Sequence, residues 1–133
     1  MNWKTEREHP DALDLAEVIE VYRSSGLGER RPISETDRFE AMIRNANLIV
    51  TCRLDSRLVG IARSVSDFSY VTYLSDIAVS SEFQRKGIGR ALIEETQRAA
   101  PGVKIVLLSA PGAVDYYPHI GFTRHNSAWV LPA

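Results

Sequence analysis

A basic segment with two glycines at residues 84–90 carries the residue types best suited to holding a phosphate. It reads Gln-Arg-Lys-Gly-Ile-Gly-Arg and directly precedes a pattern typical of a helix. The first N–H groups of a helix have no intrahelical acceptor and lie at the positive end of its dipole, so they bind anions. Gly87 and Gly89 leave the backbone open to an oxyanion, and Arg85, Lys86 and Arg90 add positive charge. The segment therefore predicts a cradle for a diphosphate.

Two common phosphate motifs do not fit this spacing. A nucleoside-triphosphate loop places four residues between its first glycine and a Gly-Lys-Ser/Thr triplet, and the dinucleotide fingerprint needs a third glycine. Neither pattern is present in residues 79–93. What remains is Gln84-Arg85-x-Gly87-x-Gly89 after an expected strand that ends Asp76-Ile77-Ala78-Val79. This combination resembles the acetyl-CoA motif of the GNAT superfamily of N-acetyltransferases.

The resemblance implies acetyl-CoA as cosubstrate and assigns its parts to residues. The backbones of Ile77, Ala78 and Val79 would pair with the pantetheine arm, as an added strand pairs with a sheet edge. No metal is expected, because the His, Cys and acidic residues show no ligand spacing. The pyrophosphate would be held by residues 84 to 90, which are Gln84, Arg85, Lys86, Gly87, Ile88, Gly89 and Arg90.

A second motif at residues 113–122 is similar to the family's Ala-x-x-x-Tyr-x-x-x-Gly-Phe, and Tyr117 occupies its aromatic position. When an amine attacks a thioester, a thiolate leaves, and a phenol within hydrogen-bond reach can donate a proton to it. The ordinary pKa values of a thiol and a phenol, about 8.5 and about 10, are close enough for this transfer. The resemblance thus implies Tyr117 as general acid. A buried packing role is the alternative, although the adjacent Tyr116 could fill it instead.

Two positions depart from the family pattern. Many relatives carry an asparagine that contacts the cofactor three residues before the motif alanine, where this chain has Ala110. Several also place a glutamate, as general base, at the position of Tyr73, so the base is unassigned. Asp76 is the nearest carboxylate, but strand alternation places it opposite Tyr73, Ser75 and Ile77, which favours a structural role.

The acceptor side of the site is less readable. Arg30 and Arg31 either hold a carboxylate or phosphate of the acceptor or form a solvated basic loop. Phe68, Tyr70 and Tyr73 either wall an acceptor pocket or are ordinary strand aromatics. The leading hypothesis is an N-acetyltransferase that acts on a primary amine of a small molecule or protein. An acyl-CoA-binding sensor without turnover and a nucleotide-phosphate binder remain as alternatives.

Hydrophobic periodicity predicts the elements that must position these residues. Helices are expected from Pro10 to Gly26, from a capping pair at Ser34 and Asp37, from the glycine turn to Pro101, and near 112–119. Strands are expected at 2–8, 48–54, 57–65, 70–79, 103–108 and from 122 onward, with 103–108 as a central strand buried on both faces.

The resulting order, β-α-α-β-β-β-α-β-α-β, resembles the GNAT fold. That fold is an α/β architecture whose twisted, mixed sheet splays open between the fourth and fifth strands, here 70–79 and 103–108. About four helices flank the sheet.

Composition places limits on the class of protein. The 133 residues fit a single domain spanning 1–133, and no apolar run is long enough to cross a bilayer. A net charge of -1 argues against a general nucleic-acid or membrane-surface protein. Cys52 is the only cysteine and is expected in the core, and Met1–Lys4 has no apolar signal region, so a cytoplasmic location is expected. The stretch 127–131 could be a homodimer interface strand, or Trp129 could lie in the core.

Overall fold

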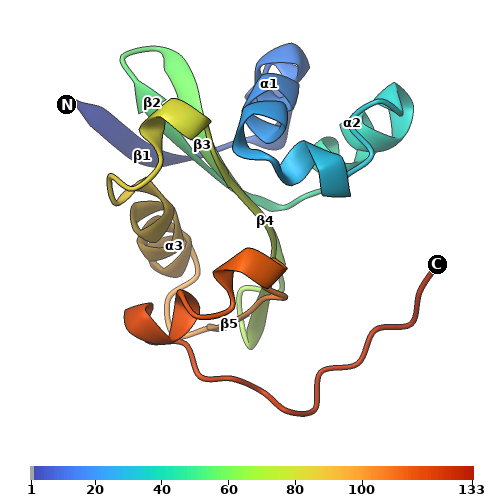
Figure 1. Ribbon diagram of the computed structural model, residues 1–133, viewed down its shortest axis with the longest axis vertical. Coiled ribbons are helices and arrows are strands. Elements are labelled where there is room, and N and C mark those ends of the chain that lie inside the picture. The colour runs from blue at the N-terminus through green and yellow to red at the C-terminus, as the bar shows by residue number, and fades with distance from the viewer. Residues whose placement is uncertain (1) are drawn as a thin grey trace.

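A computed structural model describes residues 2–133 and shows a five-stranded sheet between two helical layers (Figure 1). The strand order is β1-β2-β3-β4-β5; the first four strands are antiparallel, and β5 runs parallel to β4. The α-helices and strands are β1 (Trp3–Glu8), α1 (Leu15–Ser25), α2 (Thr36–Arg44), β2 (Leu48–Leu54), β3 (Arg57–Ser66), β4 (Val71–Val79), α3 (Ile88–Ala99) and β5 (Lys104–Val106). This is the α/β sheet architecture that the sequence predicts.

Helices α1 and α2 cover one face of the sheet. The Asp14 side chain caps the first turn of α1 by accepting a hydrogen bond from the Ala16 N–H, and Gly26 ends the helix in the left-handed conformation. Tyr22 of α1 is fully buried and meets Phe39 of α2 edge to face, with ring centroids 5.0 Å apart. Burial of this apolar face fixes both helices against β2 to β4.

Helix α3 covers the other face and packs tightly on β3. Its apolar stripe includes Ile88 and Leu92, both almost fully buried. A Cβ atom at Gly60 of β3 would lie 3.1 Å from the Cγ2 atom of Ile88, so the close approach depends on this glycine. The packing places the first turn of α3 beside the carboxyl end of β4.

The sheet opens between β4 and β5. The two strands pair only through Val71–Tyr73 and Lys104–Val106. The remainder of β4, Leu74–Val79, has no strand partner on this side within residues 2–133. The predicted splay between the fourth and fifth strands is therefore present.

A β-bulge at Ser75 changes which side chains share a face of β4. Arg63 pairs with Asp76 and Val65 pairs with Tyr73, so β4 contains one extra residue between the two pairs. Paired residues point to the same face, which places Tyr73 and Asp76 together. The sequence argument that put them on opposite faces is wrong because strict alternation fails at a bulge.

Two predicted helix starts are shifted. Pro10–Ala12 forms a 3-10 turn, and α1 begins at Leu15. Ser34 and Asp37 do not form a capping pair, because the N-cap residue of α2 is Glu35, whose side chain makes no capping hydrogen bond. Proline fits a short turn as well as a helix start, so its signal is ambiguous here.

The C-terminal elements differ most from the prediction. β5 has three residues and lies at the sheet edge, with Val106 44% exposed, and is not a central strand. The segment expected to form a fourth helix contains two 3-10 turns, Pro111–Ala113 and Tyr117–Ile120, because prolines interrupt it. Within residues 2–133 no strand follows Phe122, and Trp129 is 91% exposed instead of lying in the core.

Two further findings concern burial and membrane crossing. Cys52 lies in the core, as expected, and burial raises the pKa of its thiol to about 11, which disfavours the reactive thiolate near neutral pH. No helix in the described part of the chain has the length and apolar character needed to span a bilayer.

Candidate functional site

The N-terminus of α3 is open to an anion. Gly87 is the N-cap residue with φ 86°, a conformation that favours glycine, and no side chain caps the helix. A Cβ atom at Gly87 would meet nothing within 4 Å, and one at Gly89 would meet only the Ile77 side chain at 4.0 Å. The side chain of Ile88 is buried in the core, so this residue can offer only its backbone N–H. The first N–H groups of α3 thus have free space in front of them.

Basic side chains surround this helix end. Arg85 and Lys86 are exposed and form no ion pair with any described residue. Arg90 pairs with Glu94 at 3.4 Å, but both side chains are at least half exposed, so water screens this contact. The segment therefore keeps a local positive charge that a phosphate could neutralise.

Gln84 has a different place from the other residues of the segment. Its side-chain amide donates a 2.9 Å hydrogen bond to the carbonyl oxygen of Val79. This contact ties the loop before α3 to the end of β4. Gln84 therefore positions the loop, while its side chain is occupied within the protein.

The open edge of β4 offers backbone groups from alternate residues. The N–H of Ser80 donates to the carbonyl of Val59 in β3 at 2.9 Å. Antiparallel pairing alternates, so the backbone groups of Ala78 also point to β3, whereas those of Ile77 and Val79 point to the open edge. Of the three residues predicted to bind pantetheine, Ala78 has no free backbone group at this edge.

A cavity of about 190 Å³ lies where β4 and β5 separate. Tyr117 is one of its lining residues, and the Tyr117 hydroxyl makes no hydrogen bond with any described residue. Burial, together with the neighbouring Tyr116, raises the pKa of Tyr117, so the phenol stays protonated. The lining residues are Leu27, Arg30, Arg31, Leu74, Ser75, Ile77, Leu107, Leu108, Ala110, Ala113 and Tyr117.

The ring of Tyr117 is also partly buried and packs against the edge of the core. Its centroid lies 5.3 Å from those of Tyr116 and Phe122, both in edge-to-face contact. The packing fixes the ring while the hydroxyl remains free. The two roles that the sequence left open for this residue are therefore compatible.

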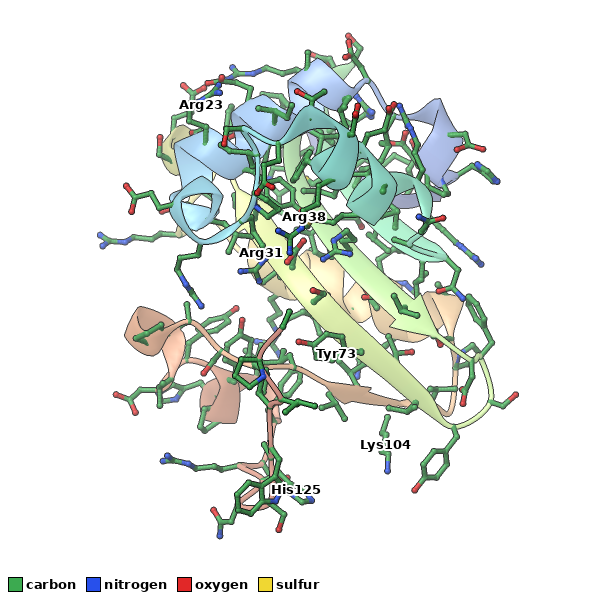
Figure 2. The ribbon with its side chains drawn as sticks, turned by 90° about the vertical axis from the view of Figure 1, so that its right-hand side faces the viewer. Arg23, Arg31, Arg38, Tyr73, Lys104 and His125 are labelled. Atoms are coloured by element: carbon green, nitrogen blue, oxygen red, sulfur yellow. The ribbon has the colours of Figure 1, made fainter. Side chains whose placement is uncertain are left out.

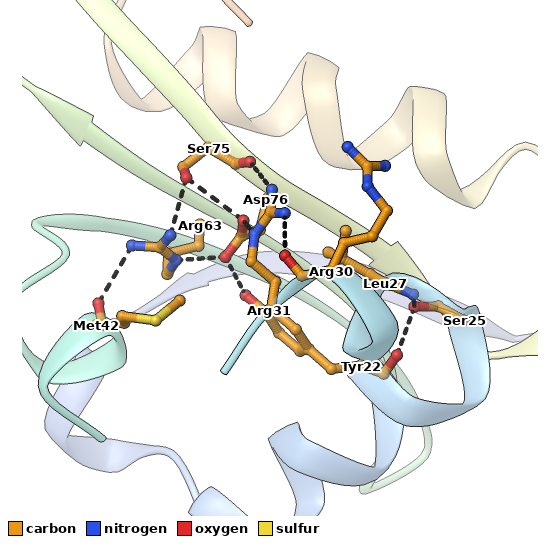
Figure 3. A network of polar contacts seen from close by, with 9 residues as sticks. All are labelled: Tyr22, Ser25, Leu27, Arg30, Arg31, Met42, Arg63, Ser75 and Asp76. Carbon is orange, nitrogen blue, oxygen red and sulfur yellow. Dashed lines mark hydrogen bonds and ion pairs between the residues drawn. The ribbon is translucent and has the colours of Figure 1, made fainter. Parts of the chain in front are cut away.

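A buried carboxylate joins β4 to the segment after α1 (Figure 3). Asp76, whose side chain is 0% exposed, accepts 2.6 Å hydrogen bonds from the Nε atoms of Arg31 and Arg63 and a 2.7 Å bond from the Tyr22 hydroxyl. Burial alone would raise the pKa of Asp76, but the hydrogen bonds and charges of Arg63, Tyr22 and Arg31 lower it, so the carboxyl is ionised. Asp76 therefore has the structural role that the sequence favoured.

The sequence did not reveal this network. Arg63 donates to Asp76 and Ser75 on β4 and to the Met42 carbonyl on α2, so its partners are distant in the chain. Arg31 also donates 3.0 Å to the Ser75 carbonyl, at the bulge. The sequence shows only that Arg63 is a charged residue in the middle of an apolar strand. This pattern does not indicate which residue it pairs with.

The three aromatics considered for an acceptor pocket do not line the cavity. Phe68 lies under the guanidinium of Arg7, and Tyr70 lies under the ammonium group of Lys104, 4.0 Å from the ring centroid. Tyr73 is 39% exposed (Figure 2). In the same view Lys104 lies well below Arg31, which is one of the residues that line the cavity.

A larger groove and the question of a metal complete the description. The groove, about 480 Å³, lies between α3, β5 and residues 120–123, and neither Tyr117 nor Gly87 lines it. Within residues 2–133, no three His, Cys, Asp or Glu side chains are placed to hold a metal ion.

Comparison with known families and relatives gives a consistent result. The profile of the Acetyltransferase (GNAT) domain matches residues 18–130. The chain is 34% identical to GCN5-related N-acetyltransferase 2, chloroplastic, of Arabidopsis thaliana, and the match covers 78% of this chain and 50% of that protein. It is 26% identical to the uncharacterized N-acetyltransferase ycf52 of Pyropia yezoensis, over 84% of this chain and 66% of that one. The chain thus spans about half to two thirds of these relatives.

Solved structures share the fold at low sequence identity. A putative acetyltransferase from Deinococcus radiodurans has a TM-score of 0.76 at 14% identity, over 97% of this chain and 87% of that one. An aminoglycoside acetyltransferase from an uncultured soil metagenomic sample has a TM-score of 0.71 at 22% identity, over 98% of this chain and 95% of that one.

Proposed function

The chain belongs to the GNAT family of acetyltransferases, and from this premise we propose that it moves an acetyl group from acetyl-CoA to a primary amine. One observation carries the proposal. The open edge of β4 connects the anion cradle at Gly87 to the cavity that Tyr117 lines, and Ile77 borders both. A ligand with an anionic end and an extended, amide-containing arm fits such a track.

The residues present suit that cosubstrate. The N–H groups at Ile88 and Gly89, with the side chains of Arg85 and Lys86, would hold the pyrophosphate. The pantetheine amides would pair with the free backbone groups of Ile77 and with the N–H of Val79. Within the predicted segment, Gln84 contributes by positioning the loop.

The transfer needs one attack and two proton movements. The amine nitrogen forms a bond to the acetyl carbon, and the bond from that carbon to sulfur breaks. Tyr117 donates its hydroxyl proton to the departing thiolate, and the nitrogen loses a proton to solvent. Backbone N–H groups at the open edge would stabilise the charge on the carbonyl oxygen. The Tyr117 hydroxyl is free to approach the sulfur, and its raised pKa keeps the proton on the phenol until the thiolate departs.

A second candidate function is an acyl-CoA-binding sensor with little or no turnover. Ala110, in place of the asparagine that many relatives carry, lines the same cavity and has no side-chain hydrogen-bonding group to offer. A weaker grip on the acyl end would reduce catalysis more than binding.

A thiol-release assay separates the two functions. The protein is mixed with acetyl-CoA and a panel of amines, and free CoA is followed with a thiol reagent, while calorimetry measures CoA and ADP binding. Amine-dependent release supports the transferase, and tight CoA binding with no release on any amine supports the sensor. Stronger binding of ADP than of CoA would contradict both functions, because the pantetheine arm would then add nothing to the affinity.

A cytoplasmic location and a homodimer stay predictions from the sequence, and one relative is named as chloroplastic.

A further inference from the structure

The side chain of Arg30 is left uncommitted beside the Asp76 network (Figure 3). Its carbonyl oxygen accepts a 2.8 Å hydrogen bond from Arg31, which fixes its backbone next to β4. Its guanidinium is exposed and makes no ion pair or hydrogen bond with any described residue. Arg30 nevertheless lines the cavity that Tyr117 lines. A fixed backbone with a free guanidinium suits the binding of an anion.

The charge around the cavity has one sign. Two arginines line it, and no acidic side chain does. In the network behind it, the guanidiniums of Arg31 and Arg63 face the single carboxylate of Asp76, so one positive charge is unbalanced. Arg30 adds a second. Apolar walls such as Leu27 and Leu107 limit screening by water, so the field at the cavity is positive.

The cavity leaves limited room for an acceptor. Its 190 Å³ is below the roughly 300–1,000 Å³ of a pocket that encloses a drug-sized ligand. The acetyl group and the reacting amine would share this space beside Tyr117. Groups of a small acceptor further from the amine would lie toward the rim, where Arg30 is exposed.

We propose that the acceptor is a small amine that also carries an anionic group, a carboxylate or a phosphate, and that Arg30 binds this group at the rim of the cavity. The proposal rests on the acetyl transfer proposed above and names its substrate class. Arg31 acts as a positioning residue, because its guanidinium is occupied by the Arg30 carbonyl, the Ser75 carbonyl and the Asp76 carboxylate. Polycationic amines are disfavoured, because they would bring positive charge to a positive rim.

Matched amine pairs test the proposal by turnover. The pairs are alanine and alaninamide, 4-aminobutyrate and butylamine, and phosphoethanolamine and ethanolamine, with spermidine as the polycation. The first two pairs report on a carboxylate and the third on a phosphate. We expect at least one anionic member to exceed its neutral counterpart, and spermidine, by tenfold or more in kcat/KM. Arg30→Gln should reduce that ratio at least tenfold through KM, and Arg30→Lys should restore part of it.

Arg38→Gln is the matched control. This arginine is 65% exposed on α2 and does not line the cavity, so its loss removes the same charge without touching the site. The ratio should stay unchanged in this variant. Equal loss in Arg38→Gln and Arg30→Gln would overturn the proposal, because net charge alone would then explain the preference.

Binding distinguishes failure of this proposal from failure of acetyl transfer. Calorimetry on the CoA-saturated protein measures the anionic amines directly. Turnover of neutral amines or spermidine with no anionic preference overturns the acceptor class and leaves acetyl transfer standing. Arg30-dependent binding of an anionic amine without turnover supports the anion site at Arg30 and overturns acetyl transfer. If no anionic amine is bound or turned over, the acceptor class is overturned.

Discussion

Replacing Asp76 with asparagine tests whether one buried carboxylate holds the segment after α1, which lines the cavity, to β4. The carboxylate accepts three short hydrogen bonds of 2.6, 2.6 and 2.7 Å, two of them from guanidiniums, and a longer one of 3.4 Å from the Ser75 hydroxyl. Asparagine has nearly the same shape but no charge and one acceptor oxygen. Its NH2 group would also face an arginine donor. The substitution thus removes the interactions with little change in volume.

The expected loss of stability is large. Removing one partner of a buried ion pair costs about 3–5 kcal/mol, because the remaining charge is left without compensation. The side chain of Arg63 is 11% exposed and stays poorly hydrated, whereas that of Arg31, at 23%, regains part of its hydration. We therefore expect a loss of about 3–4 kcal/mol in the free energy of unfolding. For a domain of this length this corresponds to a fall in Tm of about 10–15 °C.

Urea unfolding followed by circular dichroism measures this loss. Glu20→Gln is the control, because Glu20 also pairs with an arginine at 2.9 Å but both side chains are more than 60% exposed. Its loss should stay below about 1 kcal/mol. A similarly small loss in Asp76→Asn would refute the view that this network stabilises the site.

The dependence on pH has a defined sign. The folded protein lowers the pKa of Asp76, so its contribution is fully present above the ordinary value of about 3.9 and is lost as the pH falls through the folded pKa. The gap in unfolding free energy between wild type and Asp76→Asn should be constant from about pH 8 to pH 5 and should narrow in stronger acid. A gap that persists unchanged in acid would contradict the ionised carboxylate.

Three further predictions concern the cosubstrate. Tyr117→Phe should lower kcat at least tenfold and leave the CoA affinity measured by calorimetry within a few fold of wild type, and an unchanged kcat removes Tyr117 from the mechanism. In the wild type, kcat should show no alkaline decline until the pH exceeds about 10, because the phenol pKa is raised. Gly87→Val should weaken CoA binding at least tenfold without unfolding the domain. Gly102→Val is the control, because Gly102 also has a positive φ, 74°, and free space around it, and this variant should bind CoA as the wild type does. Equal effects of the two variants would rule out an anion site at Gly87. Arg85→Ala should cost about 1–3 kcal/mol of CoA binding free energy at low salt and less at high salt. Arg98→Ala, near the opposite end of α3, is the control and should change CoA binding little. A loss in Arg85→Ala that does not depend on salt would argue against a phosphate contact.

Local sequence signals predicted the proposed cosubstrate end of the site and most of the sheet. The segment 84–90 predicts an anion-binding helix start because glycine conformation, basic charge and the helix boundary are local properties. The hairpin of β2 and β3, the strand that became β4 and the stripe of α3 also follow from periodicity over a few residues. The C-terminal elements were overpredicted, since apolar residues after Leu107 suggest order that Pro111 and Pro118 interrupt.

Only the tertiary structure decided the acceptor side. The bulge at Ser75 is invisible to alternation, because an extra residue in β4 is defined by its register with β3. Arg31 binds Asp76, whereas the side chain of the adjacent Arg30 is left free. This difference depends on which arginine reaches a carboxylate 45 positions further along the chain. Pairing across such distances is set by how the helices and strands pack, and no local pattern of residue types contains that information.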